Sequence, residues 1–229
     1  MKGNQFLEGS HNPLNVIDVI KHNLIYRRNH PGYFDPDGLL IFCGEQGSGK
    51  TLSAVQYVKA LCQAYPRAIL CTNVAISGLP EDTKVVEYDG LDCIKRLENG
   101  IYGVIYLIDE IHLEFNSLES KNIPIEIMVE VSQQRKQRKH IVGTTQVYGR
   151  LAKPFREQVK NVVLCQNFFH VLQFNRLIDG SRSREEDGKI VTETSRGYFW
   201  FHSPALYDCY DTYAKMKRYR KEWKGRKIQ

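Results

Sequence analysis

Residues 39–51, with the sequence LLIFCGEQGSGKT, decide the fold of this 229-residue chain. The first five are apolar, as expected for a strand that is buried on both faces in a parallel sheet. Residues 44–51 then fit the pattern G-x-x-x-x-G-K-[ST], in which a glycine-rich loop leads from such a strand into a helix. The stretch therefore predicts an α/β protein with a phosphate-binding loop; the alternative is a glycine-rich turn that holds no ligand.

The loop has the chemistry that a polyphosphate requires. Its glycines let the backbone curl so that successive N–H groups point inward, and the helix that begins near Lys50 adds the positive end of its dipole. We expect Lys50 to reach the β- and γ-phosphates and Thr51 to offer its hydroxyl to Mg²⁺. The predicted nucleotide-binding residues are Gly44, Glu45, Gln46, Gly47, Ser48, Gly49, Lys50, Thr51 and Leu52.

Strand and helix patterns alternate after this loop. We expect strands at 39–43, 68–72, 84–88, 104–109, 140–145 and 160–165, and helices at 50–65, 90–98 and 123–138. This alternation predicts an α/β fold of three layers with a mostly parallel sheet. Before the loop, Asn12, Pro13 and the apolar spacing that follows predict a half-buried leading helix. After residue 166, two β-rich runs around the polar loop SRSREED predict a β-hairpin appended to the sheet edge.

The chain divides into four predicted parts. They are an N-terminal helical arm (1–37), a phosphate-loop core (38–166), a β-hairpin extension packed on the core (167–212) and a basic tail (213–229). The tail holds eight Lys or Arg residues against one Glu, whereas the rest of the chain has 24 basic and 25 acidic residues. Such a tail is a candidate for contact with nucleic acid; the alternative is a solvated tail that aids solubility.

The composition excludes several classes of protein. Hydrophobic residues make up 42% of the chain, too many for a mainly disordered polymer. No apolar run approaches the roughly 18 residues that span a bilayer, and the first residues lack the apolar segment of a signal peptide. We therefore expect a soluble protein of the cytosol. The six cysteines lack metal-ligand spacing and lie mostly in apolar runs, so we expect reduced thiols in the core.

A second motif, VIYLIDE at 104–110, ends a buried strand with Asp109 and Glu110. Ligands of open α/β sheets bind at the carboxyl ends of the strands, where these two carboxylates are expected. Asp109 would hold the Mg²⁺ shell, directly or through water, and Glu110 would polarise a water for attack on the γ-phosphate. The alternative is a strand-to-helix cap made of two acids. His112 would form a hydrogen bond near the site. The alternative is a histidine at the edge of the sheet whose hydrogen bonds are only structural.

Residues 133–146, QQRKQRKHIVGTTQ, join a cluster of cations to a short strand. Arg135 and Arg138 would lie along the margin of the apolar stripe of the predicted helix. A guanidinium there would reach the γ-phosphate of a neighbouring subunit as an arginine finger. The alternative is a cationic helix end that interacts with its own helix dipole. Gln146 would stand beside the carboxylates and touch both the water and the γ-phosphate as a sensor, unless it is a turn residue that faces solvent.

These segments together resemble the ATPase domain of Zot-like (zonula occludens toxin-like) proteins. The resemblance spans about residues 38–213 and rests on GEQGSGKT, TN at Thr72 and Asn73, YLIDE, the eleven-residue spacing from Arg135 to Gln146, and ALYDCYDTY at 205–213. That group includes the assembly ATPases of filamentous phages, and it belongs to the FtsK/HerA class of DNA pumps and viral genome-packaging ATPases.

The resemblance implies a P-loop fold of the additional-strand type, ATP hydrolysis with Mg²⁺ in a ring of subunits, and coupling to DNA movement. Carried over by position, the catalytic residues are Lys50, Glu110, Gln146, Arg135 and, as a second candidate for the finger, Arg138. The implied Mg²⁺ ligands are Thr51 and Asp109. Arg138 falls where relatives often have glycine.

We expect a homo-oligomeric ATPase that packages or translocates genomic DNA during virion assembly in the host cytoplasm, at a capsid vertex or at a membrane. Its other partners would be a capsid protein or a membrane assembly protein. Filamentous-phage members usually continue into a membrane span, whereas this chain has a basic tail, so we favour packaging over extrusion through a membrane partner. Two different functions stay open: a monomeric P-loop kinase, with SRSREED as its lid, and a scaffold that binds ATP without hydrolysing it.

Overall fold

A single large sheet runs through the molecule. The computed structural model describes residues 13–180, 184–186, 189–191 and 195–211. The main sheet has eight strands in the order β11-β8-β7-β1-β6-β5-β2-β4. The strands are β1 (Leu39–Cys43), β2 (Ile69–Thr72), β4 (Val85–Glu87), β5 (Val104–Ile108), β6 (Lys139–Thr145), β7 (Val159–Phe168), β8 (Leu172–Asp179) and β11 (Ser195–Phe201).

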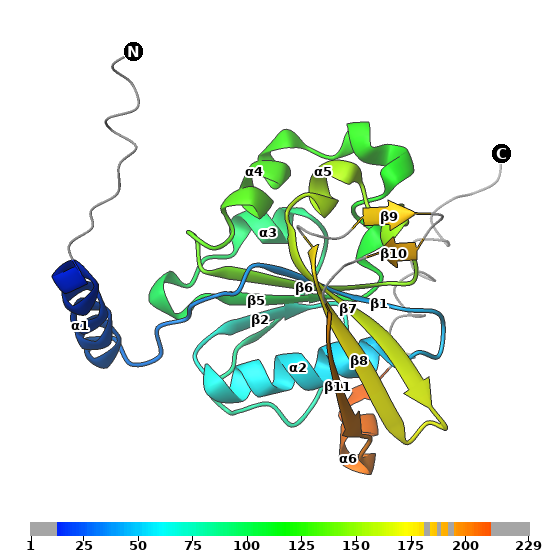
Figure 1. The fold of residues 1–229 in the computed structure, drawn as a ribbon, viewed down its shortest axis with the longest axis horizontal. Helices are drawn as coiled ribbons and strands as arrows, with labels where there is room; N and C mark the ends of the chain where they lie inside the picture. The colour runs from blue at the N-terminus through cyan, green and yellow to red at the C-terminus, as the bar shows by residue number, and fades with distance from the viewer. Residues whose placement is uncertain (1–12, 181–183, 187–188, 192–194, 212–229) are drawn as a thin grey trace.

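Helices cover both faces of this sheet, as Figure 1 shows. Helix α2 lies on one face, and α3, α4 and α5 lie on the other. The α-helices are α1 (Pro13–Asn29), α2 (Lys50–Ala64), α3 (Asp92–Arg96), α4 (Ile125–Gln133), α5 (Lys153–Arg156) and α6 (Pro204–Tyr207). Two small strand pairs complete the fold: β3 (Ala75–Ile76) with β12 (Tyr210–Asp211), and β9 (Arg184–Glu186) with β10 (Lys189–Val191).

The strand order is that of an additional-strand P-loop fold. Strands β7, β1, β6, β5, β2 and β4 pair in parallel along the sheet. Strand β6 lies between β1, which leads into the phosphate-binding loop, and β5, which ends at the two carboxylates. The prediction of a three-layer, mostly parallel α/β fold is confirmed.

Two apolar cores explain why the central strands are continuous hydrophobic runs. All five residues of β1 and all five of β5 are buried. Alternate side chains of these strands join one cluster with α3, α4 and α5 and a second cluster with α2. Burial on both faces removes the polar alternation of a surface strand. The predicted core position of the cysteines is confirmed, because all six are buried.

Helix α4 is shorter than predicted. It ends at Gln133 rather than at residue 138, and residues 134–138 form a turn. The chain must reverse there to enter β6, and Arg138 adopts a left-handed conformation with φ 56°. Hydrogen bonds from Lys139 N to Gln134 O (2.8 Å) and from Arg138 N to Arg135 O (3.2 Å) close the turn. The helical phase assigned to Arg135 and Arg138 was therefore wrong.

The leading helix forms as predicted, but over residues 19–29, where its burial is described, the predicted half-burial is wrong. Side chains of Val19, Ile20, Leu24 and Ile25 are between 53% and 63% exposed. In Figure 1, α1 stands apart from the layered body. Among its described side chains, Arg27 forms an ion pair with Asp35 (3.0 Å) in the segment that follows the helix. Periodicity predicted an apolar stripe but could not show whether the sheet would cover it.

The appended hairpin is part of the main sheet. Strand β8 pairs antiparallel with β7, and β11 pairs antiparallel with β8, so the sheet continues past the parallel core. The expected boundary at 166/167 falls inside β7. The predicted tail lies outside the described residues, as does part of SRSREED. Within the part that the structure describes, no helix combines the length and hydrophobicity that a membrane crossing needs.

Candidate functional site

The phosphate-binding loop lies at the carboxyl end of β1 and runs into the first turn of α2. Gly47 and Gly49 adopt positive φ angles of 82° and 78°, which side chains disfavour and glycine allows. Gly44 has no space for a side chain, because a Cβ there would lie 2.9 Å from the carbonyl oxygen of Cys165. Lys50 begins α2 and is buried to 7% exposure. The loop thus has the glycine conformations and the buried lysine of a phosphate-binding loop, while the N–H groups of Gly44 and Ser48 donate to Thr145 O (3.3 Å) and Glu45 O (3.1 Å).

Three hydroxyl and carboxyl groups meet beside the loop. Thr51 Oγ1 donates to Asp109 Oδ1 at 2.9 Å, and Thr144 Oγ1 donates to the same oxygen. Asn73 fixes the backbone of Asp109 from the next strand: its Oδ1 accepts from Asp109 N at 2.8 Å, and its Nδ2 donates to Asp109 O at 3.0 Å. The structure thus brings Thr51 and Asp109 together, although the two are 58 residues apart in the chain.

These residues fit a Mg²⁺ ion. The donor set consists of a threonine hydroxyl and a carboxylate, and hard divalent cations take oxygen ligands of this kind together with substrate phosphates. Thr51 is adjacent to Lys50 at the start of α2, so a cation held here would contact a phosphate bound in the loop. Thr144 steadies the carboxylate from β6, in the manner of outer groups that orient a metal ligand.

Glu110 occupies the centre of the group. Lys50 Nζ lies 3.8 Å from Glu110 Oε1, and Gln146 Nε2 donates to the same oxygen at 3.3 Å. His112 Nδ1 lies 3.3 Å from Glu110 Oε2. The backbone of Glu110 is left-handed, with φ 53° and ψ 47°, and its N–H donates to Thr144 Oγ1 at 2.9 Å. The expected proximity of Gln146 to Glu110 is thus present, and His112 lies in direct reach of the carboxylate.

Sequence reasoning missed the residues that support the loop from β8. Gln173, which is fully buried, donates from Nε2 to the carbonyl oxygen of Ser48 at 2.9 Å. Asn175, two residues on, donates to Ser53 Oγ at 3.2 Å in α2. Buried amides two residues apart on one face of a strand require internal partners. The alternation in LQFNRLID was the available signal, but it did not show which loop the amides would contact.

The two arginines lie near the amino end of β6, at the opposite end of the strands from the candidate site. The turn 134–138 precedes β6, whereas Gln146 follows it, and seven strand residues span about 20 Å. Arg135 is exposed at this end of the strands. Arg138 Nη1 donates to Phe34 O at 3.0 Å, and its guanidinium lies 3.8 Å from the ring centroid of Tyr33. Neither residue joins the site of its own chain, and Arg138 is already engaged within that chain.

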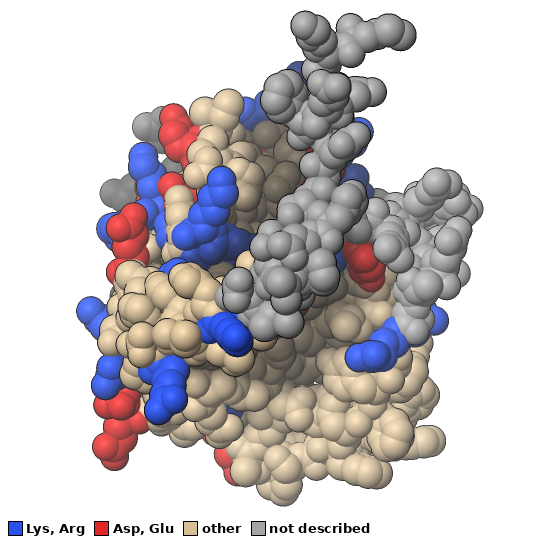
Figure 2. Space-filling view, turned by 60° about the vertical axis from the view of Figure 1, so that its left-hand side comes forward, with Lys and Arg blue, Asp and Glu red and all other residues tan. Residues whose placement is uncertain are grey.

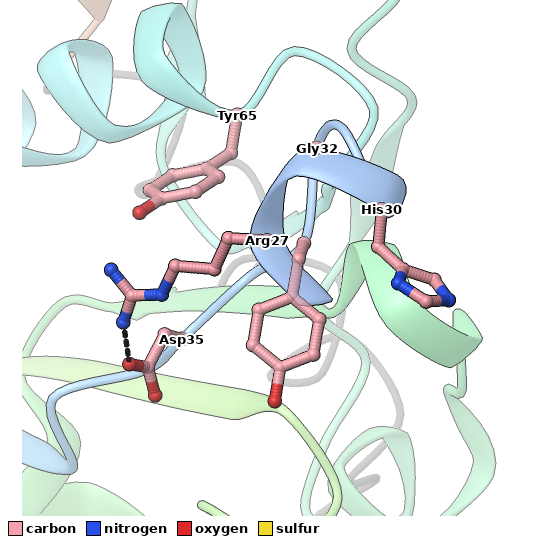
Figure 3. A pocket seen from close by; sticks show the side chains of 6 residues that line it. Arg27, His30, Gly32, Asp35 and Tyr65 are labelled. Atoms are coloured by element: carbon pink, nitrogen blue, oxygen red, sulfur yellow. Dashed lines mark hydrogen bonds and ion pairs between the residues drawn. The ribbon is translucent and has the colours of Figure 1, made fainter. Parts of the chain in front are cut away.

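A cavity of about 840 Å³ opens over the loop. Its lining includes Gly44 to Ser48 on one side, Gln146 to Tyr148 near β6, and Leu164 to Phe168 with Arg176 on the strands of the sheet edge. A second hollow of about 320 Å³ lies by the segment after α1, where Arg27 faces Asp35 (Figure 3). Gln146 lines the first cavity, whereas Lys50, Thr51, Asp109 and Glu110 lie outside its lining. The second hollow has no residue of the phosphate-binding loop, and Asp35 already neutralises its Arg27, so the first cavity is the one that adjoins the phosphate site.

Cys165 does not suit a covalent thiol mechanism. Cys165 packs below the loop, and burial raises the pKa of its thiol to about 12, so the sulfur stays protonated near neutral pH. The groups available for chemistry are therefore the lysine, the carboxylates, the threonine hydroxyl and the glutamine.

Comparison with known proteins agrees with this geometry. No family model matches the sequence, and no curated protein matches it. The N-terminal domain of zonular occludens toxin from Neisseria meningitidis has a TM-score of 0.53 and 15% identity, over 76% of this chain and 98% of that domain. The ATPase domain of a helicase has a TM-score of 0.50 and 9% identity, over 82% of this chain and 95% of that domain.

The genome packaging NTPase B204 of Sulfolobus turreted icosahedral virus 2, in complex with ATPγS, has a TM-score of 0.46 and 17% identity, over 56% of this chain and 74% of that protein. At these identities the first two likenesses establish the fold, and the resemblance to Zot-like domains inferred from the motifs is confirmed at that level.

Proposed function

We propose that this chain is a Mg²⁺-dependent ATPase that assembles into a ring and packages or translocates genomic DNA during virion assembly. The observation that carries the ATPase proposal is the position of Glu110, within hydrogen-bonding or ion-pair reach of Lys50 and Gln146 and next to the Thr51–Asp109 pair. A protein that only binds phosphate has no need of a carboxylate held in this position. The viral role rests on the motif resemblance to the assembly and packaging ATPases.

The loop residues bind and orient the substrate. Backbone N–H groups of the loop, apart from those of Gly44 and Ser48, and the N-terminus of α2 would surround the phosphates, and Lys50 would supply a buried positive charge. Thr51 and Asp109 would hold Mg²⁺, which would supply positive charge to offset the negative charge that develops on the phosphates. Gln173 keeps the loop in place through Ser48.

Glu110 and Gln146 act on the water. Glu110 accepts a proton or a hydrogen bond from a water that attacks the γ-phosphate, and Gln146 holds the carboxylate through its Nε2. The second N–H of Nε2 can donate to the γ-phosphate, and the amide oxygen can accept from the attacking water, so the side chain can respond to the γ-phosphate while it holds Glu110. His112, 3.3 Å from the other carboxylate oxygen, further restricts the orientation of Glu110.

A neighbouring copy completes the site in this proposal. Arg135 is exposed and lies about 20 Å from Gln146 along β6, so it can act only on the nucleotide of another chain. Arg138 is the weaker candidate, because its guanidinium is bound to Phe34 O and stacked on Tyr33. A head-to-tail ring brings one chain's exposed edge against the next chain's nucleotide.

DNA is the proposed cargo, and the host cytoplasm, at a capsid vertex or membrane, is the proposed location. The face drawn in Figure 2 carries Lys and Arg side chains spread among Asp and Glu rather than gathered in one patch. The strongest concentration of positive charge in the sequence is 213–229, which lies outside the described residues. We therefore propose that this segment contributes to the grip on DNA phosphates.

The experiment that tests the ATPase proposal is a comparison of Glu110→Gln with Glu119→Gln, an exposed glutamate away from the site. We expect Glu110→Gln to lower kcat by about 10²- to 10⁴-fold, since the general base is lost, while ATP affinity changes little. Glu119→Gln should hydrolyse ATP like the wild type. Added DNA should raise the wild-type rate.

Two results would redirect the proposal. Unchanged hydrolysis in Glu110→Gln would remove Glu110 from the chemistry and would favour a protein that uses ATP only to assemble. Transfer of the γ-phosphate to a small acceptor, without stimulation by DNA, would identify a kinase.

A further inference from the structure

Arg176 is a charged residue that lines the cavity beside the phosphate-binding loop, and the proposed mechanism does not use it. It lies on β8, on the same face of the sheet as its β7 partner Leu164, and both line the cavity above the phosphate-binding loop. Leu164 packs against the core cluster that contains α4, so this face is opposite to α2. Arg176 thus approaches the loop from the side of the sheet extension, whereas Lys50 reaches it from α2.

The surroundings of Arg176 leave its charge available. Its cross-strand neighbours are Leu164 on β7 and Gly197 on β11, neither of which carries a charge. Among the described residues, the guanidinium has no ion pair or hydrogen bond, and its side chain is exposed to the cavity. Glu45, in the loop, is the carboxylate that lines the same cavity. A planar guanidinium facing an anion-binding loop is suited to a phosphate, which it binds through two parallel hydrogen bonds.

Strand β8 holds Arg176 in a fixed position relative to the loop. The other face of this strand carries Gln173 and Asn175, which bind Ser48 O in the loop and Ser53 in α2. Both amides are buried, at 0% and 1% exposure. The strand that presents the arginine is therefore joined by hydrogen bonds to the loop and to the helix that follows it. Ligand binding would therefore order the Arg176 side chain but would need little ordering of its backbone.

We propose that Arg176 binds the phosphate chain of the nucleotide held by its own P-loop. It is a second guanidinium of the site, contributed in cis from the strand pair appended to the sheet, and is distinct from the finger of a neighbouring chain. The ligand class is a nucleoside di- or triphosphate. This inference rests on the proposed function, because it assumes that the cavity takes a nucleotide.

The test is nucleotide affinity, measured by calorimetry for ATP, ADP and adenosine. We expect Arg176→Ala to raise the Kd for ATP and ADP by about 10- to 100-fold, the range of a lost charge-assisted hydrogen bond. Adenosine, which has no phosphate, should bind the variant and the wild type equally. Arg176→Lys should recover part of the affinity, since it restores the charge without the planar fork.

Arg196→Ala is the matched control. Arg196 is an exposed arginine on β11 whose cross-strand partner is Leu177, a residue packed against the α2 side of the sheet. It should bind ATP like the wild type. The measurements are repeated in an Arg135→Ala background, where a cis contact keeps its full effect. Thermal melting curves identify any variant that does not fold. If Arg176→Ala does not fold, the ATP affinities of Arg176→Lys and Arg176→Gln are compared with that of the wild type instead.

The outcomes separate this inference from the proposed function. ATP affinity unchanged in Arg176→Ala and Arg176→Gln, in a wild type that binds and hydrolyses ATP, overturns the inference alone. An equal loss in Arg196→Ala overturns it too, because the effect would then be one of general charge. A wild type that does not bind ATP overturns both proposals.

Discussion

Two glycines of the phosphate-binding loop share a backbone conformation but differ in their surroundings. Gly47 and Gly49 both have φ near 80°, where a side chain costs about 1–2 kcal/mol. A Cβ on Gly47 would meet no atom within 4 Å, whereas a Cβ on Gly49 would lie 2.1 Å from Gln173 Oε1. We therefore expect Gly49→Ala to weaken ATP binding at least about tenfold more than Gly47→Ala, as measured by calorimetry.

The double variant Gly49→Ala with Gln173→Ala isolates the cause. Removal of the amide makes room for the new methyl group, so part of the lost ATP affinity should return. Equal losses of ATP affinity in Gly47→Ala and Gly49→Ala would show that only backbone strain matters at Gly49. The absence of recovery in the double variant would show the same.

His140 makes the stability of the chain sensitive to acid. It is 2% exposed in β6, its Nε2 lies 3.0 Å from Tyr57 Oη, and burial lowers its pKa to about 4. Asp37, which favours the charged form, and Lys160, which opposes it, are the charges that act on it. The unfolded chain, with an ordinary histidine pKa near 6.5, then binds more protons than the folded one between about pH 6.5 and pH 4.

The sign follows from that difference. Stability is highest above about pH 6.5 and falls as the pH drops toward 4, and this one group should lower the free energy of unfolding by about 2 kcal/mol between pH 7 and pH 5. Urea unfolding at the two pH values measures the change. His140→Gln should be less stable at pH 7 but should lose about 2 kcal/mol less than the wild type on going to pH 5. An identical pH dependence in the variant would assign the acid sensitivity to other groups.

At the scale of elements, the turn between α4 and β6 fastens the segment that leads into β1. Arg138 binds Phe34 O and stacks on Tyr33, so Arg138→Ala should lower the free energy of unfolding by about 1–3 kcal/mol. Arg138→Gly loses the same contacts but relieves the left-handed strain at φ 56°, so it should be about 1 kcal/mol more stable than the alanine variant. Chemical denaturation measures both.

Turnover per folded molecule should be unchanged in both Arg138 variants. If Arg138→Ala instead keeps wild-type stability and loses hydrolysis, then Arg138 rather than Arg135 would be the finger.

The elements that the sequence predicted well are those with a local cause. Strands β1 and β5 are uniformly apolar because helices cover both of their faces, and the P-loop motif carries its own backbone requirements. The end of α4 was missed because residues 134–138 are of types that favour a helix. The helix ends at Gln133 because the chain has to turn there to enter β6. The exposure of α1 and the contact of Gln173 with the loop depend on distant segments. No local pattern records such contacts.

In the whole molecule, the proposed catalytic residues lie at opposite ends of the parallel strands. Lys50, Glu110 and Gln146 gather at the carboxyl ends of the parallel strands. Arg135 lies at the amino end of β6, about 20 Å away. A rigid sheet cannot fold back to join these ends. A single chain is therefore incomplete under the proposed function, and hydrolysis should rise more than proportionally with protein concentration.

Mixed assemblies test this arrangement directly. Lys50→Ala keeps a finger but lacks a working phosphate site, and Arg135→Ala has the reverse defect, so each alone should be nearly inactive. In an equal mixture, about a quarter of the interfaces of a head-to-tail ring pair an intact Lys50 with an intact Arg135 from the neighbour. ATP hydrolysis should recover in that proportion. Mixing Lys50→Ala with Lys50→Ala/Arg135→Ala provides no intact pair and should stay inactive. Absence of recovery in the first mixture, together with hydrolysis strictly linear in concentration, would mean that each chain works alone and that Arg135 has no catalytic part.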